Sequence, residues 1–377
     1  MMKRRPFGKL QVPVSPFGMG MMRLPTGPDG NPDEAEVARM VRAAVDQGVN
    51  YFDTAFGYHG GKSEIALGKA LEGGLRDQVY IATKLPRWNV KKAEDMMPIF
   101  EEQLQKLKTD HIDFYLLHAI DGPSFEELRG YGVLDFLTEL KAAGKIRYAG
   151  FSYHDDFATL GPILDSYDWD FVQVQFNYMD VEDSAGGLSA IRLLGERNIP
   201  VVVMEPLLGG KLATPPAEVL DLFAGLGAKR APVDWAFRWI LNHPEIAVVL
   251  SGVSNMQQLQ EDIDIFRDLD AGCLTPSEAA AFEQVRETYL KRIAVPCTGC
   301  AYCKPCPANV NIPELFSLWN DFTKFSTIGG DRWRYNSIVD AKAGPDQCVG
   351  CNQCMEKCPQ SFDIPEQLRA FSDYMKS

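Results

Sequence analysis

Four titratable side chains in the first third of the chain are spaced so that they could act together as an acid–base set. Asp53, Lys84 and His118 each close a short apolar run, and Tyr58 lies in the loop just beyond Asp53. A phenol has a pKa near 10, and a neighbouring ammonium favours its phenolate. We therefore expect Lys84 to lower the pKa of Tyr58, with Asp53 holding Lys84 in place. A histidine beside the phenol can orient a carbonyl group or share its proton.

Each of these residues taken alone has a structural explanation, such as a salt-bridge partner for Lys84 or a wall for Tyr58. Their joint placement at successive strand ends favours catalysis instead. Such a set suits proton delivery to a carbonyl oxygen as hydride reaches its carbon. Further polar residues close apolar runs later in the chain: Ser152, Asn177, Glu205 and Ser251.

Eight of the nine cysteines fall between Cys297 and Cys358 and form two runs. The second run fits the C-x2-C-x2-C-x3-C-P pattern that ligates [4Fe–4S] clusters, and the first departs from it by one residue before its fourth cysteine. Four thiolates would also suit a structural zinc ion, but zinc sites usually pair two C-x2-C knuckles. The spacing therefore predicts two [4Fe–4S] clusters. The runs are Cys297, Cys300, Cys303, Cys306-Pro307 and Cys348, Cys351, Cys354, Cys358-Pro359.

The cysteine region resembles the helical ferredoxin modules of several oxidoreductases. In two-cluster ferredoxins the fourth cysteine of each run serves the other cluster. The resemblance thus implies one cluster on Cys297, Cys300, Cys303 and Cys358. It implies the other on Cys348, Cys351, Cys354 and Cys306. We expect Cys273 to be a small buried apolar residue.

Residues 1–270 alternate short apolar runs with amphipathic stretches, as parallel strands covered by helices do. Eight such units in about 250 residues predict a closed (β/α)8 TIM barrel, an α/β fold. A doubly wound open sheet is the alternative, but no G-x-G-x-x-G follows the first strand. The expected strands lie at 17–20, 50–54, 79–84, 112–118, 146–152, 171–177, 200–206 and 248–252. The expected helices lie at 33–48, 62–72, 92–108, 125–143, 154–166, 184–198, 231–242 and 255–268.

The composition changes sharply after a helical connector at 274–295. We place a barrel domain at 1–290 and a small, mainly helical ferredoxin-like domain at 291–377, with one helix expected at 312–325.

The net charge of −13, without a basic patch, argues against nucleic acid or an anionic membrane as a partner. The start of the chain has no apolar run of signal-peptide length, and no later run approaches the ~18 apolar residues of a membrane helix. Clustered cysteines without an export signal indicate metal ligation in a reducing compartment. We therefore expect a cytoplasmic protein.

Residues 5–270 resemble the aldo-keto reductases. The likeness rests on Asn50–Ala55 with Tyr58, on Gly61–Glu64, and on Ile81–Lys84, Tyr115–His118 and Gly150–Ser152. It implies that Tyr58 is the general acid/base, that Lys84 and Asp53 tune it, and that His118 orients the substrate. It also implies a nicotinamide cofactor, commonly NADPH, and a small carbonyl or alcohol substrate.

The resemblance also implies a set of cofactor contacts. Ser152 and Gln173 match residues that hold the nicotinamide carboxamide. Met204–Leu207 occupies the position at which many aldo-keto reductases have Tyr-Ser-Pro-Leu. The aromatic side chain that stacks on the nicotinamide in those proteins is therefore replaced. The segment Ser251–Asn255 resembles the adenine-binding segment but brings no Lys or Arg, which leaves both NADP and NAD open. The full set is Gly20, Met21, Ser152, Gln173, Glu205, Pro206, Leu207, Gly209, Gly252, Ser254, Gln258 and Asp262.

Three functions remain open at this point. The chain could be a carbonyl/alcohol oxidoreductase using NAD(P)H, with clusters that are structural or sense redox state. It could draw electrons from a ferredoxin-like partner, possibly through a bound flavin, because nicotinamide passes hydride whereas such clusters pass single electrons. It could also be a non-catalytic, redox-sensing barrel. Trp88 and Tyr131 either line the substrate pocket or have packing roles.

Overall fold

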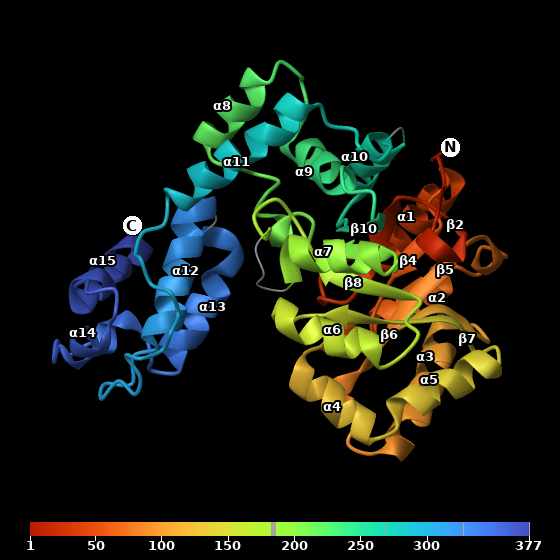
Figure 1. The fold of residues 1–377 in the computed structure, drawn as a ribbon, viewed down its shortest axis with the longest axis horizontal. Coiled ribbons are helices and arrows are strands. Elements are labelled where there is room, and N and C mark those ends of the chain that lie inside the picture. The colour runs from red at the N-terminus through yellow and green to blue at the C-terminus, as the bar shows by residue number, and fades with distance from the viewer. Residues whose placement is uncertain (182–185, 268, 327, 377) are drawn as a thin grey trace. The chain divides into compact units, whose positions relative to one another are not determined.

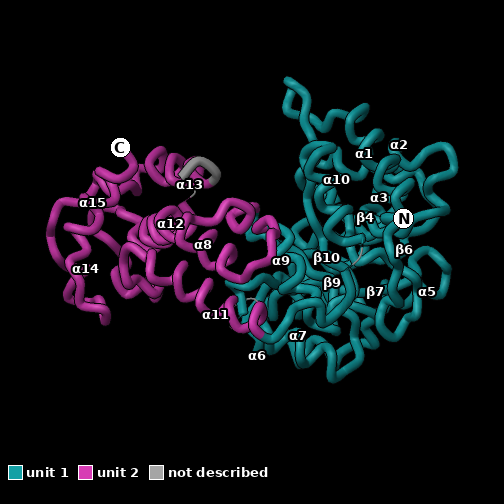
Figure 2. Tube along the Cα trace, turned by 90° about the horizontal axis from the view of Figure 1, so that it is seen from above, with its two compact units in different colours: residues 1–209, 233–276 teal, residues 210–232, 277–377 magenta. Residues whose placement is uncertain are grey.

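The computed structural model describes residues 1–181, 186–267, 269–326 and 328–376. The chain divides into two compact units, which Figure 2 distinguishes by colour. The first comprises Met1–Gly209 and Val233–Pro276, and the second comprises Gly210–Pro232 and Ser277–Ser377. The compact units thus divide earlier than the domain boundary expected at 290, and residues 210–232 belong to the second unit. Residues 184, 185 and 268, which belong to the helices expected at 184–198 and 255–268, are not among the residues that the structure describes.

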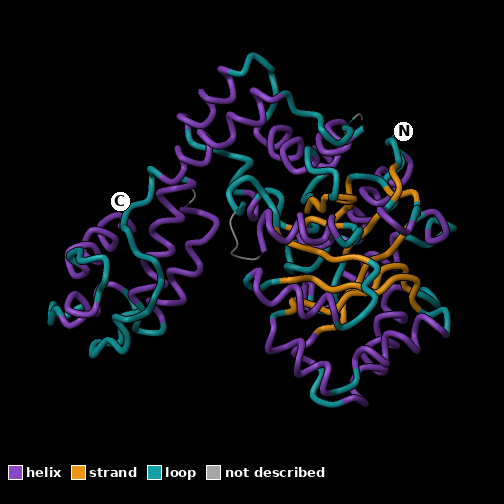
Figure 3. The backbone as a smooth tube through the Cα atoms, in the orientation of Figure 1, coloured by secondary structure: helices purple, strands orange, loops and turns teal. Residues whose placement is uncertain are grey.

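The first unit is a closed barrel of eight parallel strands, as predicted, with order β10-β3-β4-β5-β6-β7-β8-β9 (Figures 1 and 3). Each expected apolar run contributes one strand, because a strand covered on both faces needs apolar residues on both. The strands are β3 (Phe17–Gly20), β4 (Tyr51–Asp53), β5 (Tyr80–Pro86), β6 (Ile112–Ile120), β7 (Ile146–Tyr153), β8 (Phe171–Gln175), β9 (Val201–Met204) and β10 (Ile246–Gly252).

Helices follow the strands along the chain and cover the barrel. The single helix expected at 125–143 is in fact two helices, because Gly132 adopts φ 80° between them and ends the first. The helices of this unit are α1 (Glu34–Asp46), α2 (Ser63–Ala70), α3 (Met96–Leu107), α4 (Gly122–Gly130), α5 (Val133–Ala142), α6 (Phe157–Asp165), α7 (Gly187–Glu196), α9 (Pro232–Leu241) and α10 (Met256–Phe266).

The interior of the barrel is filled by side chains and closed at one end. Alternate residues of the strands point inward, and Tyr51, Phe114 and Phe171 make aromatic contacts there. Phe7 packs against all three at centroid distances of 6.2, 4.9 and 6.0 Å. Phe7 follows β1 (Arg5–Pro6), which pairs with β2 (Pro13–Val14). This hairpin closes the amino-terminal end of the barrel, so a site can lie only at the opposite, carboxyl end.

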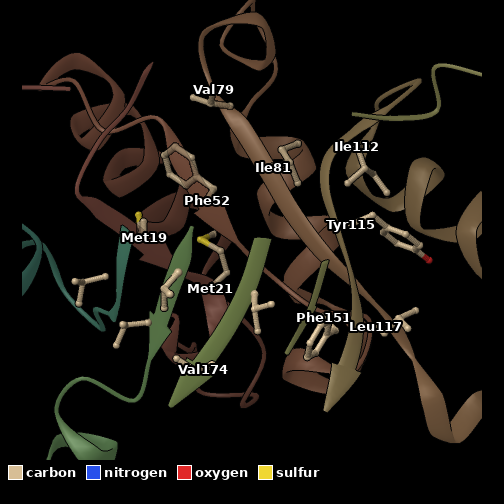
Figure 4. Packing of buried hydrophobic residues seen from close by; sticks show 14 of the residues in the cluster. Met19, Met21, Phe52, Val79, Ile81, Ile112, Tyr115, Leu117, Phe151 and Val174 are labelled. Atoms are coloured by element: carbon tan, nitrogen blue, oxygen red, sulfur yellow. The ribbon is translucent and has the colours of Figure 1, made fainter. Parts of the chain in front are cut away.

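The outward-facing residues of the same strands form a second, larger core against the helices. Figure 4 shows Phe52, Ile81, Tyr115, Leu117 and Phe151 in this layer. The two cores together fix the strand register, because a one-residue slip would exchange their faces.

The second unit contains helices and loops in its described residues (Figure 3). Its apolar core lies between α12 (Ile312–Phe325) and α15 (Ile364–Lys376), where Trp319 stacks on Phe371 at 5.4 Å. The sequence predicted α12, and the helical connector expected at 274–295 corresponds to α11 (Pro276–Leu290). No described helix combines the length and apolar character needed to cross a bilayer. The remaining helices are α8 (Ala217–Gly225), α11 (Pro276–Leu290), α13 (Ile328–Asp340) and α14 (Gln353–Lys357).

Candidate active site and cysteine cavities

The carboxyl end of the barrel carries a ring of polar side chains in place of the apolar interior. Asp53, Lys84 and Gln173 follow the inward-facing Tyr51, Ala82 and Phe171 by two residues, so they point to the same side. Ser152 and Gln173 are register partners on adjacent strands. Asp53, Lys84, Ser152 and Gln173 are buried, and His118 is half-buried. The strand periodicity therefore brings these five predicted residues into one layer.

Lys84 is held by two oxygen atoms from β4 and the residue that follows it. Its Nζ donates to Asp53 Oδ1 and to the carbonyl oxygen of Thr54, both at 2.7 Å. Burial by itself lowers the pKa of Lys84, but the charge of Asp53 and the phenol of Tyr58 outweigh it and raise the pKa. Lys84 is thus a buried ammonium at neutral pH.

Tyr58 begins a short turn after β4, η3 (Tyr58–Gly61), and lies beside the lysine. Lys84 Nζ is 5.2 Å from the centre of its ring. The pKa of Tyr58 is raised, because burial of the phenol outweighs the opposing effect of Lys84. Lys84 does act to lower this pKa, as expected, but the effect of burial is larger, and sequence spacing carries no information about desolvation. Tyr58 is a protonated phenol at neutral pH.

His118 lies next to Tyr58, with ring centroids 6.1 Å apart and nearly perpendicular planes. Trp88 covers it from another side at 4.8 Å. Burial, followed by the charge of Lys84, lowers the pKa of His118 to about 3. Its Nδ1 is buried and has no hydrogen-bond partner among the described residues. A neutral imidazole with an unused nitrogen can hydrogen-bond a substrate carbonyl.

A β-bulge positions His118. The pairing of β6 with β7 shifts register between Leu117 and Ile120, and Ala119 within the shift has φ 55°. The N–H of Ala119 donates to Ser152 Oγ at 2.7 Å. Ser152, predicted only as a cofactor contact, thus fixes the backbone beside His118. Sequence reasoning missed this role, because no local pattern announces the bulge.

Gln173 completes the polar layer from β8. Its Nε2 donates to Asp53 Oδ2 at 3.3 Å. Its Oε1 is buried, and no partner for it occurs within the described chain. A buried amide oxygen without a partner is costly, so a ligand donor fits here. Gln173 Oε1 and the hydroxyl of Ser152 are the acceptor and donor that a nicotinamide carboxamide would need.

The loop after β9 carries the next predicted contacts. Glu205 adopts φ 53°, and its carbonyl oxygen accepts from Asn177 Nδ2 at 3.2 Å. Its charge reaches Tyr58 and adds to the rise in the pKa of that phenol. Pro206 is buried and Leu207 packs against the outer core, so both shape the backbone. Gly209 is exposed at the end of the loop.

The predicted adenine contacts are largely engaged within the protein. Ser254 Oγ donates to the carbonyl oxygen of Arg23 at 2.9 Å, and Ser254 N–H donates to Gln258 Oε1 at 2.8 Å. Asp262 on α10 is buried, and this burial raises its pKa to about 7. The structure thus leaves little of Asp262 available to a ligand. Gly252 is exposed at the end of β10.

Arg23 lies between these two loops and was not predicted. A Cβ added to Gly252 would lie 3.3 Å from Arg23 Cβ and Cγ, and one added to Gly209 would lie 3.4 Å from an Arg23 guanidinium nitrogen. Arg23 therefore extends from the end of β10 to the loop after β9. It follows Gly20 and Met21, both buried at the end of β3. Arg23 thus places a guanidinium near both loops, although Ser251–Asp262 itself contains no Lys or Arg.

A buried hydrogen-bond network between α3 and β5 holds the strand that carries Lys84. Gln103 of α3 donates to the carbonyl oxygen of Lys84 at 3.0 Å and to Glu64 Oε1 at 2.9 Å. Tyr115 in turn donates to Gln103 Oε1 at 2.8 Å. The Ser63-Glu64 pair, noted only as part of a motif, thus helps to hold the backbone of Lys84. Tyr131, by contrast, packs against the outer core.

The cysteines of the second unit line two separate cavities. One is lined by Cys297, Cys300, Cys303 and Cys358. The other is lined by Cys306, Cys348, Cys351 and Cys354, with Cys303 also at its edge. The fourth cysteine of each run therefore faces the first three of the other run. Burial raises the pKa of Cys303, and Cys297, Cys300 and Cys358 add to that rise.

The thiols of each set line a space and are not arranged around the position of a single metal ion. Within the described ranges, no three His, Cys, Asp or Glu side chains are grouped as ligands of one metal ion. A cubane takes one thiolate at each of four iron corners, so its ligands enclose a space. Two cavities, each with four thiols and apolar neighbours such as Phe316 and Leu368, fit two such clusters. Cys273 packs instead against the barrel core.

A (β/α)8 barrel with a phenol, a buried ammonium and a neutral imidazole at its carboxyl end defines an oxidoreductase-type site. The model of the Aldo/keto reductase family matches residues 16–286, and the chain belongs to that family. It is an oxidoreductase that acts on carbonyl groups with NAD(P)H. Residues 296–362 match the 4Fe-4S dicluster domain.

Individual relatives cover the barrel. The chain is 28% identical over 286 residues to the 6-dehydroglucose reductase of Novosphingobium aromaticivorans, spanning 70% of this chain and 90% of that protein. It is 27% identical to the NADH-specific methylglyoxal reductase of Escherichia coli, spanning 70% and 93%. The aldo-keto reductase AKR11C1 from Bacillus halodurans superposes with a TM-score of 0.64 at 25% identity, spanning 76% and 96%.

Proposed function

We propose that the chain reduces a small aldehyde or ketone, with Tyr58 as the proton donor. The observation that carries this proposal is the meeting of a protonated phenol and a neutral imidazole beside the buried ammonium of Lys84. The names of two relatives, a 6-dehydroglucose reductase and a methylglyoxal reductase, support a small carbonyl substrate.

Tyr58 gives its proton to the carbonyl oxygen as negative charge develops there. The phenolate that remains lies next to the ammonium of Lys84, which stabilises it. Asp53 keeps that ammonium charged despite its burial. A nicotinamide, when bound, supplies the hydride that reaches the carbonyl carbon.

His118 acts on the same oxygen as a hydrogen-bond donor. Its pKa of about 3 keeps it neutral, so it orients the carbonyl without competing for the proton of Tyr58. Trp88, about half exposed, forms a wall of the pocket beside it.

We further propose that Ser152 and Gln173 hold the nicotinamide carboxamide and that Arg23 binds a phosphate of the cofactor. Because Ser251–Asp262 contains no Lys or Arg, no basic side chain of that segment selects a 2′-phosphate. We therefore infer that NADH and NADPH both serve.

In the dicluster domain we propose Cys297, Cys300, Cys303 and Cys358 as ligands of one [4Fe–4S] cluster. Cys306, Cys348, Cys351 and Cys354 are the proposed ligands of the other. The two four-thiol cavities support this assignment.

The test is the Tyr58→Phe variant in protein purified without oxygen. It should lose at least about 100-fold in kcat for aldehyde reduction, because removal of the acid removes general acid catalysis. Its Kd for NADPH, measured by fluorescence titration, should change less than about threefold. Turnover that survives in Tyr58→Phe would contradict the proposal.

A second candidate, reduction by electrons from a ferredoxin-like partner, is favoured by the exposure of Cys300 and Cys351. Tyr302 and Val349 beside them are 64% and 72% exposed, so both clusters would be accessible to a partner. Neither the names of these relatives nor the descriptions of the two matching families mention a flavin. Aldehyde reduction with reduced ferredoxin and no nicotinamide would support this candidate, and dependence on NAD(P)H would exclude it.

A further inference from the structure

Three consecutive strand ends place polar residues on the rim of the barrel beside His118. Pro86 of β5 is the register partner of His118, so Arg87 directly follows it at that rim. Ile120 of β6 pairs with Tyr153 of β7, and His154 N–H donates to the carbonyl oxygen of Ile120 at 2.9 Å. Arg87 and His154 thus stand on either side of the strand that carries His118.

One guanidinium nitrogen of Arg87 contacts a carboxylate, and another has no acceptor among the described residues. Its NH1 lies 3.1 Å from Asp121 Oδ2. Its Nε is buried, and in the described part of the chain no atom accepts from it. The side chain is 32% exposed. A guanidinium that is held by one carboxylate and partly exposed can bind a second acceptor through its remaining N–H groups.

The carboxylates near this rim are engaged by the start of α4. Asp121 Oδ1 accepts from the N–H of Ser124 at 2.8 Å, so this residue caps the helix as well as holding Arg87. Asp155 Oδ2 accepts from the N–H of Gly122 and from Thr159, both at 2.8 Å. Asp121 is thus shared between the cap of α4 and Arg87, and Asp155 is engaged by Gly122 and Thr159.

Lys84, His154 and Arg87 face His118 from this side, and after burial all three act to lower its pKa. Burial, Arg87 and Lys84 also lower the pKa of His154, so Lys84 and Arg87 are the cations here and His154 is a neutral imidazole. Glu205 acts on Tyr58 instead. Asp53 pairs with Lys84, and Asp121 pairs with one nitrogen of Arg87 and leaves its other N–H groups to a ligand.

We propose that Arg87, with His154, binds an anionic group of the substrate, so that the natural substrate is a carbonyl compound bearing a carboxylate or phosphate. This inference rests on the proposed carbonyl reduction and specifies its substrate class. The guanidinium pairs with the anion through charge-assisted hydrogen bonds. Anchoring one end of the substrate holds its carbonyl against Tyr58 and His118, which raises kcat as well as affinity.

The test compares matched aldehydes in the cluster-containing full chain. With NADPH, kcat/KM should be higher for 4-carboxybenzaldehyde than for 4-methylbenzaldehyde, or higher for glyceraldehyde 3-phosphate than for glyceraldehyde; the preferred pair identifies the anion. Arg87→Met should reduce that preference about 10- to 100-fold, the loss expected for a charge-assisted hydrogen bond. The rate with the uncharged aldehyde should change less than about threefold. Arg87→Lys should lie between the two.

Arg129→Met is the matched control, since Arg129 pairs with Glu126 on the exposed face of α4. It should leave both rates unchanged. If wild type and Arg87→Met preferred the anionic aldehyde over the uncharged one by the same factor, the anion site would be refuted. If reduction still depended on Tyr58 in that case, the proposed function would stand. Calorimetric binding of 4-(hydroxymethyl)benzoate gives an activity-free measurement. Its Kd should rise about 10-fold or more in Arg87→Met, and an unchanged Kd would refute the anion site even if no aldehyde were turned over.

Discussion

The ammonium nitrogen of Lys84 lies 2.7 Å from a carboxylate oxygen of Asp53, with the two residues only 1% and 3% exposed. Lys84→Met would leave the carboxylate of Asp53 buried without its cation. Removal of one partner from a buried pair typically costs about 3–5 kcal/mol. We expect Lys84→Met to lose turnover and to melt at a clearly lower temperature than the wild-type protein.

The double variant Asp53→Asn/Lys84→Met separates stability from chemistry. It removes both charges, so thermal unfolding should recover most of the lost stability while aldehyde reduction stays absent. Recovery of turnover in the double variant would contradict the role of the ammonium.

The pH dependence of reduction follows from the two neutral groups that face the carbonyl. His118 titrates near pH 3 and the pKa of Tyr58 lies above its ordinary value of 10, so neither changes protonation between pH 6 and 9. We expect kcat/KM for reduction to be flat across that range. It should fall only at higher pH, where Tyr58 loses the proton that it must donate. An apparent pKa near 7 that disappears in His118→Gln would show that His118 titrates in the working range.

Asp262 should make the barrel less stable as pH rises. Its pKa is about 7 in the folded protein and 3.8 ordinarily, so between these values the folded state binds a proton that the unfolded state has released. Stability is therefore lost as pH rises from about 4 to about 7. Asp262→Asn removes this cost, up to about 4 kcal/mol at pH 8 at 1.36 kcal/mol per pKa unit.

The measurement is thermal unfolding at pH 5 and pH 8. Asp262→Asn should raise the melting temperature more at pH 8, whereas Asp221→Asn, an exposed site on α8, should change neither. An equal effect at both pH values would contradict the raised pKa.

Arg23 spans Gly252 and Gly209 at the mouth of the barrel, where we place a cofactor phosphate. Arg23→Met should weaken NADH and NADPH binding by a similar factor, about 10-fold or more, because one charge-assisted contact is lost from a group that both share. Fluorescence titration gives the two Kd values. A loss confined to NADPH would instead assign Arg23 to the 2′-phosphate.

The pairing of the cysteine runs can be tested by iron content. Two [4Fe–4S] clusters require about eight irons per chain. Cys358→Ser and Cys297→Ser should each leave about four, and so should their combination, since we assign both to one cluster. Cys358→Ser with Cys348→Ser should leave almost none. If Cys358 instead served the Cys348 run, that second combination would retain about four irons.

All eight strands of the barrel were predictable, because buried parallel strands must be continuously apolar and their spacing is visible along the chain. The helix α15 was not expected, although its buried residues Ile364, Leu368, Phe371 and Met375 recur at helical spacing in the sequence. The helix α13 has no comparable pattern and was missed because its sequence is largely polar.

The residues of the candidate site were also accessible from sequence, since Asp53, Lys84 and His118 close apolar runs. The direction of the Tyr58 pKa was not, because burial competes with the charge of Lys84 and only the surrounding atoms decide which prevails. Arg23 was likewise hidden, because Gly209 and Gly252, which it bridges, are distant in sequence.

Spacing alone determined the barrel, the acid–base set and the two cysteine runs, since periodicity and ligand intervals are local properties of a chain. Tertiary structure decided how those groups behave. The bulge at Ala119 positions His118, Ser152 holds that bulge, and Asp121 both caps α4 and pairs with Arg87. Desolvation and hydrogen-bond competition depend on neighbours that only the folded chain brings together.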